Sequence, residues 1–200
     1  MSDTIDLAPP PVASRAKNLK AETRETHERL DGSIMAGRPF ESQERYALFL
    51  AVQHAFHRDI DALYANPTLD ALLPDLAGRR RFGDIEQDFA DLGMAAPERA
   101  EAPAFGTSAD IPTALGWLYV AEGSNMGAAF LIKAAGRIGL SETHGARHLA
   151  GAPEGRGLHW RTFTEALDAL ELDDAEEARM IEGARAAFAR VQGLVTQTFG

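Results

Sequence analysis

Apolar residues recur at steps of three and four along most of this chain, which is the spacing of one face of an α-helix. The pattern predicts helices over residues 16–35, 42–65, 79–92, 112–138, 158–170 and 173–198. The sequence shows neither the strict alternation of a half-buried strand nor a repeat of fixed period. We therefore expect an all-α fold of six to eight helices in a single domain.

Several residues mark where these helices begin and end. Ser42 is a candidate N-cap, and Pro112 falls in the first turn of its helix. Asp173 followed by Glu176 has the form of a capping box, and Gly93 stands where a helix C-terminus is usually followed by glycine. These signals support four of the predicted boundaries.

Proline and glycine interrupt the helical pattern between the predicted helices, and Pro67 and Pro74 punctuate a short segment after residue 65. Residues 1–14 contain three consecutive prolines and few apolar side chains, so we expect a disordered N-terminal lead before a folded domain over residues 15–200. Residues 94–108 and 139–157 have no periodicity and are predicted to be irregular connections.

The long apolar segment from Leu115 to Lys133 carries Gly116, Gly123 and Gly127. A glycine inside a helix costs roughly 1 kcal/mol relative to alanine, so three glycines in one helix require an explanation. One explanation is that another helix packs closely across the gap. The other is that a flat ligand lies against a helix surface without side chains.

Composition narrows the function classes. The net charge of −10 argues against general nucleic-acid binding, which requires a basic surface. The absence of cysteine excludes disulfides, thiolate catalysis and cysteine-ligated metal centres. The sequence has no signal-peptide pattern and no apolar run long enough for a membrane span, so we expect a cytoplasmic protein without a membrane partner.

His27 is the histidine whose position is most informative. It falls on the predicted inward stripe of the first helix, together with Leu19, Thr23, Leu30 and Ile34. Asp31, one turn later, is placed to accept the Nδ1 proton and leave Nε2 available to coordinate iron. A satisfied core histidine is the alternative, and the sequence leaves both interpretations open.

The other histidines are more typical of structural positions. His57 comes three positions after His54, and His148 comes four positions after His144. Both spacings are compatible with a metal site. Such pairs more often form the polar flank of a helix. His159 stands at the predicted start of a helix.

Cationic side chains are candidates for binding an anionic group at the rim of a site. Lys20 lies two turns before His27 on the same helical face. The last helix carries Arg179, Arg185 and Arg190, which either face the same rim or pair with neighbouring glutamates. The basic run of residues 79–81 is predicted to lie on the surface.

These segments together resemble those of the bacterial heme oxygenases, over about residues 16–199. The matching segments are residues 19–31, 40–46, 56–64, 115–130 and 144–149. The resemblance implies a single-domain fold in which heme lies between a proximal and a distal helix. It also implies that His27 is the iron ligand, that Gly123 and Gly127 lie over the macrocycle, and that Lys20 and Arg185 face its propionates.

The resemblance further implies an O2-dependent reaction that converts heme to biliverdin, CO and ferrous iron. An external donor such as a ferredoxin or reductase would supply the electrons, and a biliverdin-using photoreceptor is a candidate partner. Gly123, Ser124 and Gly127 would form the catalytic face, with Ser124 in the position of an aspartate in animal-type enzymes. The proton route is therefore unassigned.

Lysines at positions 20 and 133 bear on which biliverdin isomer forms. Some similar bacterial enzymes that release other isomers combine an asparagine at the first position with a lysine at the second. This chain has Lys20 and Lys133, and we expect the α isomer. Two rival functions remain: a heme or bilin carrier or sensor without turnover, and an all-α scaffold without a cofactor.

Overall fold

The computed structural model describes residues 14–200, and its regular structure is helical throughout. The α-helices are α1 (Arg15–Ala36), α2 (Gln43–Ile60), α3 (Pro67–Leu72), α4 (Phe82–Asp91), α5 (Ile111–Gly136), α6 (Arg156–Ala169) and α7 (Asp174–Phe199). Three short 3-10 helices are η1 (Asp61–Ala65), η2 (Ala77–Arg79) and η3 (Arg147–Leu149). Within residues 14–200, β pairing is limited to isolated bridges around Ser141. The all-α prediction is confirmed.

The predicted lead over residues 1–14 lies outside the described residues, except for Ser14. The Ser14 side chain accepts a hydrogen bond from Lys17 N and is the N-cap of α1. None of the helices found over residues 14–200 combines the length and the apolar character needed to cross a bilayer.

The predicted helix boundaries are confirmed where a capping residue marks them. Ser42 accepts from Arg45 N, and both hydrogen bonds of the Asp173–Glu176 capping box are present. Gly93 has a φ of 68°, the left-handed conformation that glycine adopts without strain.

The predicted helix over residues 42–65 is instead divided: α2 ends at Ile60 and the chain tightens into η1. Asn66 then caps α3 by accepting from Thr68 N and Leu69 N, and Pro67 follows in the first turn. The predicted helix from residue 79 begins only at Phe82, because Arg79 belongs to η2. Boundaries without a strong capping signal were therefore the ones placed wrongly.

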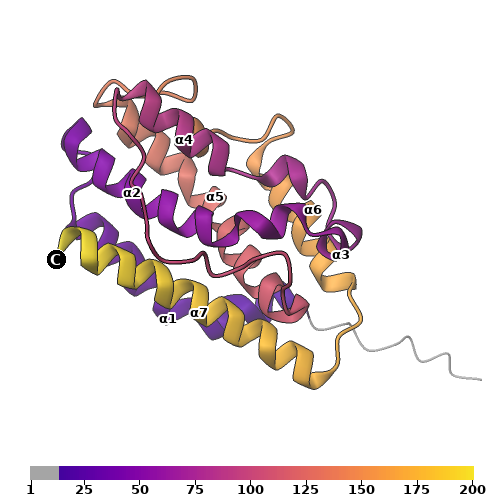
Figure 1. Cartoon of the computed structure of the whole chain (residues 1–200). Helices are drawn as coiled ribbons and strands as arrows, with labels where there is room; N and C mark the ends of the chain where they lie inside the picture. The colour runs from indigo at the N-terminus through magenta and orange to yellow at the C-terminus, as the bar shows by residue number, and fades with distance from the viewer. Residues whose placement is uncertain (1–13) are drawn as a thin grey trace, which may run out of the picture.

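Helices α1 and α7 lie side by side along the lower edge of the molecule, and α5 runs behind α2 (Figure 1). The largest helix contact is that of α5 with α7. A Cβ added to Gly116 would lie 2.1 Å from Met180 O, and one added to Gly183 would lie 2.4 Å from Thr113 O. Two glycines thus allow the backbones of α5 and α7 to approach closely. For Gly116, the explanation by helix packing is the right one.

Candidate active site

Gly123 and Gly127 differ from Gly116 in what surrounds them. A Cβ at Gly127 would meet no atom within 4 Å, and one at Gly123 would meet only the Trp160 ring, at an ordinary contact distance of 3.5 Å. Beside Gly127, the apolar side chains of Met126 and Phe130 are exposed, Phe130 by 77%. Among residues 14–200, no helix packs against α5 at Gly127. It presents an apolar surface with a glycine at its centre.

His27 lies on the surface of α1 rather than in the core. Its side chain is 57% exposed, whereas Leu19, Thr23 and Leu30 on the same stripe are buried. At 100° per residue, His27 lies about 40° from Thr23 and so stands at the flank of the stripe. The prediction of an inward His27 is wrong for this reason, and so is the interpretation as a satisfied core histidine.

The surroundings of His27 match those expected of an oriented imidazole. Its Nδ1 atom is 3.4 Å from Asp31 Oδ2, one helical turn away, as the sequence predicted. Its ring meets Phe188 of α7 edge-on, with the ring centroids 5.8 Å apart. Phe188 therefore supports one side of the ring, and Asp31 is near the Nδ1 atom.

The cationic residues predicted at the rim of the site differ in how free they are to bind an anionic group. Lys20 and Lys133 are exposed on α1 and α5. Arg185 Nη2 is 2.6 Å from Glu22 on α1, and its Nη1 is 2.6 Å from Glu182. The two carboxylates neutralise Arg185, so binding a further anion would require it to give up these contacts.

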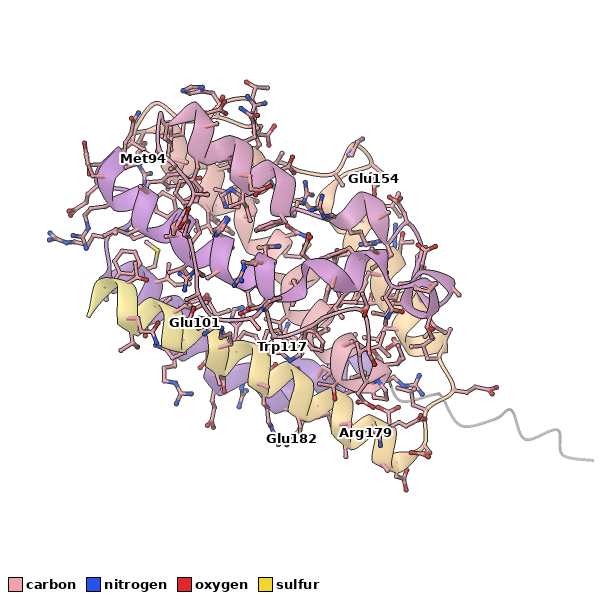
Figure 2. All side chains as sticks on the ribbon, in the orientation of Figure 1. Met94, Glu101, Trp117, Glu154, Arg179 and Glu182 are labelled. Atoms are coloured by element: carbon pink, nitrogen blue, oxygen red, sulfur yellow. The ribbon has the colours of Figure 1, made fainter. Side chains whose placement is uncertain are left out.

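The two neighbouring arginines of α7 are also paired. Arg190 Nε donates to the buried carboxylate of Asp59 at 2.7 Å, and Arg179 Nε donates to Asp110 at 3.3 Å. In Figure 2, Arg179 and Glu182 lie along the lower edge of the molecule, on α7. The sequence interpretation of the α7 arginines as partners of neighbouring glutamates is correct for Arg185 with Glu182 and for Arg179 with Glu176, whereas Arg190 pairs with Asp59 instead.

Ser124 is exposed, and its hydroxyl donates to Ala121 O at 2.7 Å. This local bond to the helix backbone uses the donor of the side chain. Ser124 can accept a hydrogen bond in this rotamer, but it would have to rotate to donate one to a ligand.

A buried ion pair holds α5 directly before Gly123. Glu122 and Arg79 are each 2% exposed, and Arg79 Nη1 donates to Glu122 Oε2 at 2.9 Å. Tyr64 OH donates to the other Glu122 oxygen at 3.3 Å, and burial raises the pKa of Tyr64 well above its usual value. The prediction that the basic run of residues 79–81 lies on the surface is wrong for Arg79, because the carboxylate of Glu122 compensates its burial.

His159 extends this network toward the surface. Its Nε2 atom is 3.5 Å from Glu122, and its Nδ1 atom is 2.7 Å from Glu154, which lies in the connection that leads into α6 (Figure 2). The contact with the Glu122 carboxylate, followed by the hydrogen bond with Glu154, raises the pKa of His159. The N-terminal turns of α6 are thus tied to α5.

A second polar cluster is buried between α2, α4 and η3. His148 Nδ1 is 2.6 Å from Asp88 Oδ2, and Asp88 also accepts from the backbone amides of Arg147 and His148. Neither His148 Nε2 nor His57 Nδ1 has a hydrogen-bond partner among residues 14–200. Burial, followed by the charges of His148 and Arg81, lowers the pKa of His57 to about 3.

The histidine pairs therefore do not form the polar helix flanks that the sequence suggested. Of the four histidines in these pairs, His54, His57 and His148 are buried and His144 is exposed. Among the described residues, no group of three or more His, Asp or Glu side chains is arranged to hold a metal ion.

The sequence model of the heme oxygenase family matches residues 13–197. The chain belongs to the heme oxygenase family. It is 40% identical over 185 residues to heme oxygenase PigA of Pseudomonas aeruginosa, which covers 92% of this chain and 93% of that protein. It also matches a crystal structure of the NO- and CO-bound heme oxygenase from Neisseria meningitidis with a TM-score of 0.88 and 43% identity, covering 94% of this chain and 92% of that one.

Heme oxygenases degrade heme to biliverdin, so this chain is an enzyme with heme as its substrate. The surface of this heme oxygenase fits a flat iron macrocycle. Gly127 leaves space against an apolar helix, and His27 supplies an exposed imidazole with a carboxylate near Nδ1. The exposed ammonium groups of Lys20 and Lys133 are suited to the carboxylates at the edge of such a molecule.

Sequence reasoning missed the side chains that hold α5 in place from behind. One signal was available: Glu122 interrupts an apolar run, and a carboxylate buried in such a run requires a buried partner. No sequence pattern identifies that partner as Arg79, because the two residues are 43 positions apart and meet only in the folded chain.

Proposed function

We propose that this heme oxygenase binds heme between α1 and α5, with His27 Nε2 as the iron ligand and the Gly123–Gly127 face of α5 on the opposite side. The observation that carries the proposal is the exposed apolar surface at Gly127, where a Cβ would touch nothing. Helix packing does not explain this glycine, because no neighbour requires the absence of a Cβ. A glycine inside a helix lowers the stability of that helix by roughly 1 kcal/mol relative to alanine.

Each proposed residue has a distinct task. Asp31 accepts the Nδ1 proton of His27 and keeps the imidazole neutral at Nε2. Gly123 and Gly127 bring the backbone close to the bound substrate and leave room for a diatomic gas, with Ser124 at the edge of this face. Lys20 and Lys133 bind the propionates, and Arg185 joins them after releasing Glu22 and Glu182.

Bound heme supplies the iron at which O2 is reduced, and the electrons come from another protein. With no cysteine, the chain cannot ligate an iron–sulfur cluster of its own through thiolates. A ferredoxin or a reductase is the donor that we propose. The α isomer of biliverdin is the proposed product, and a photoreceptor that uses biliverdin is the proposed recipient.

The test is the His27→Ala variant, with His144→Ala as the matched control. His144 is also exposed and is not part of the proposed site. Because the His27 side chain is more than half exposed, its loss should leave the fold intact. We expect that His27→Ala changes the absorption spectrum of the hemin complex and abolishes biliverdin formation with ascorbate in air, while His144→Ala behaves as the parent chain.

Full turnover with an unchanged spectrum in His27→Ala would reject the ligand assignment. The same assay separates the enzyme from a carrier or sensor. A hemin complex of the parent chain that takes up O2 under reducing conditions and remains stable, without forming biliverdin, would favour the carrier.

A further inference from the structure

The N-terminal turns of α6 direct three side chains at one short segment of α5. Trp160 packs 3.5 Å from the Cβ position of Gly123, and His159 Nε2 is 3.5 Å from Glu122. Arg156 Nη1 donates to Asn125 O at 2.8 Å. Residues 156, 159 and 160 lie on one helical face because they are separated by three and four positions.

Arg156 makes a contact that the other two residues do not make. Its second terminal nitrogen, Nη2, donates to Leu149 O in η3, so the guanidinium joins the backbone of α5 to that of η3. The α5 carbonyl that it binds belongs to Asn125, between Gly123 and Gly127. Glycine gives little resistance to backbone displacement, so this segment needs an external support to keep one position.

The hydrogen bonds of Arg156 indicate that its side chain serves to bind the carbonyls of Asn125 and Leu149. Among residues 14–200 its guanidinium donates to two backbone oxygens, and it forms no ion pair with a carboxylate. Burial is the main cause that lowers the pKa of Arg156. A partly desolvated cation without a carboxylate partner is stabilised by its hydrogen bonds to carbonyl oxygens, and losing them would leave the charge unsatisfied. These hydrogen bonds therefore fix the position of the guanidinium.

We propose that Arg156 is a positioning residue that fixes the Gly123–Gly127 segment of α5 against η3 and so sets the width of the space above Gly127. The proposal rests on the proposed function for its consequence in catalysis. The mechanical part, in which Arg156 restrains α5, stands without any ligand.

The first experiment measures amide hydrogen exchange in the protein without heme. We compare Arg156→Met and Arg156→Lys with Arg161→Met, a control on the same helix whose side chain is exposed. Arg156→Met should speed exchange over residues 123–130 roughly tenfold, because hydrogen bonds from a charged donor are lost. Arg156→Lys, which keeps a cationic donor, should restore part of the protection, and Arg161→Met should leave it unchanged.

Equal exchange over residues 123–130 in the parent chain and in folded Arg156→Met would overturn the proposal. If Arg156→Met does not fold, Arg156→Lys and Arg156→Gln are compared with each other. Faster exchange in the glutamine variant, confined to this segment, supports the restraint. Equal exchange in these two variants and the parent chain, or a uniform increase over the whole chain, opposes it.

The second experiment uses the hemin complex. Arg156→Met should shift the pH dependence of the visible spectrum and lower kcat more than hemin affinity, because the macrocycle still binds His27 while the opposite wall moves. An unchanged pH profile together with a loss of hemin affinity alone would assign Arg156 to binding and reject positioning. If the parent chain shows no His27-dependent spectrum, the proposed function fails, and the exchange result still decides whether Arg156 restrains α5.

Discussion

At the scale of single residues, burial sets His57 apart from the exposed histidines. His27 and His144 are exposed, whereas His57 is buried within a cluster with His148 and Arg81. A neutral imidazole tolerates such a place, but a protonated one does not, because burial disfavours the charge. The stability of the fold should therefore depend on pH through His57.

The pKa of His57 is about 3 in the folded chain and about 6.5 when unfolded. Below pH 6.5 the unfolded chain binds a proton that the folded chain does not, so stability falls as the pH is lowered toward 3. The slope for one group is about 1.4 kcal/mol per pH unit. Urea unfolding at pH 7 and pH 5 should show that His57→Phe removes a large part of this loss.

His144→Phe is the control for that measurement, because His144 is exposed and lies outside the buried cluster that contains His57. The same fall in stability between pH 7 and pH 5 in His57→Phe and in the parent chain would contradict the role of His57.

At the scale of elements, α5 uses its glycines for two purposes. Gly116 allows contact with α7, where a Cβ would collide with the backbone at Met180 and Ala184. A Cβ at Gly127 would meet no atom of residues 14–200 within 4 Å, and Gly127 lies on the proposed substrate face. Gly123 stands between these cases, beside the Trp160 ring. One helix therefore contains a glycine needed for packing and a glycine that we assign to function.

Substituting these glycines by alanine should change stability in opposite directions. Gly116→Ala should lower the free energy of unfolding by about 3 kcal/mol, because two helix backbones must separate. Gly127→Ala should raise it by up to about 1 kcal/mol through helix propensity, and it should slow biliverdin formation. Chemical denaturation and a turnover assay of both variants measure these effects.

A stable Gly116→Ala variant would show that the α5–α7 contact relaxes easily. A Gly127→Ala variant with parental activity would place the substrate face elsewhere on α5.

At the scale of the whole molecule, separate helices must meet to orient one substrate. His27 and Lys20 come from α1, Gly127 and Lys133 from α5, and Phe188 from α7. Helices α1 and α5 each pack against α7, and Tyr119 OH donates to Ala16 O at 3.4 Å near the start of α1. In the proposed site, the orientation of heme in its plane would thus depend on two lysines, Lys20 and Lys133, that different helices carry.

We expect the parent chain to release mainly the α isomer of biliverdin, because in the proposed site Lys20 would hold the propionates on the α1 side. Lys20→Asn should shift the product toward other isomers by leaving Lys133 as the main cation, and Lys133→Ala should keep the α isomer. Chromatography of the products after turnover distinguishes the isomers. A parent product dominated by another isomer would assign the propionates to Lys133.

The sequence by itself determined the helical class, the positions of most helices and the capping residues, because these depend on local periodicity and on hydrogen bonds within a few residues. It also singled out His27 with Asp31 and the glycines of α5, which are local patterns. It could not decide whether each glycine faced a helix or open space.

Only the tertiary structure decided which polar side chains are buried and which partners they meet. Arg79 with Glu122, Asp88 with His148, and Arg156 with Asn125 each join residues more than 30 positions apart. The side chain of His27 is exposed because α1 turns the flank of its stripe away from the core. Such outcomes depend on how the helices pack, and helical periodicity within one segment carries no information about the element that packs against it.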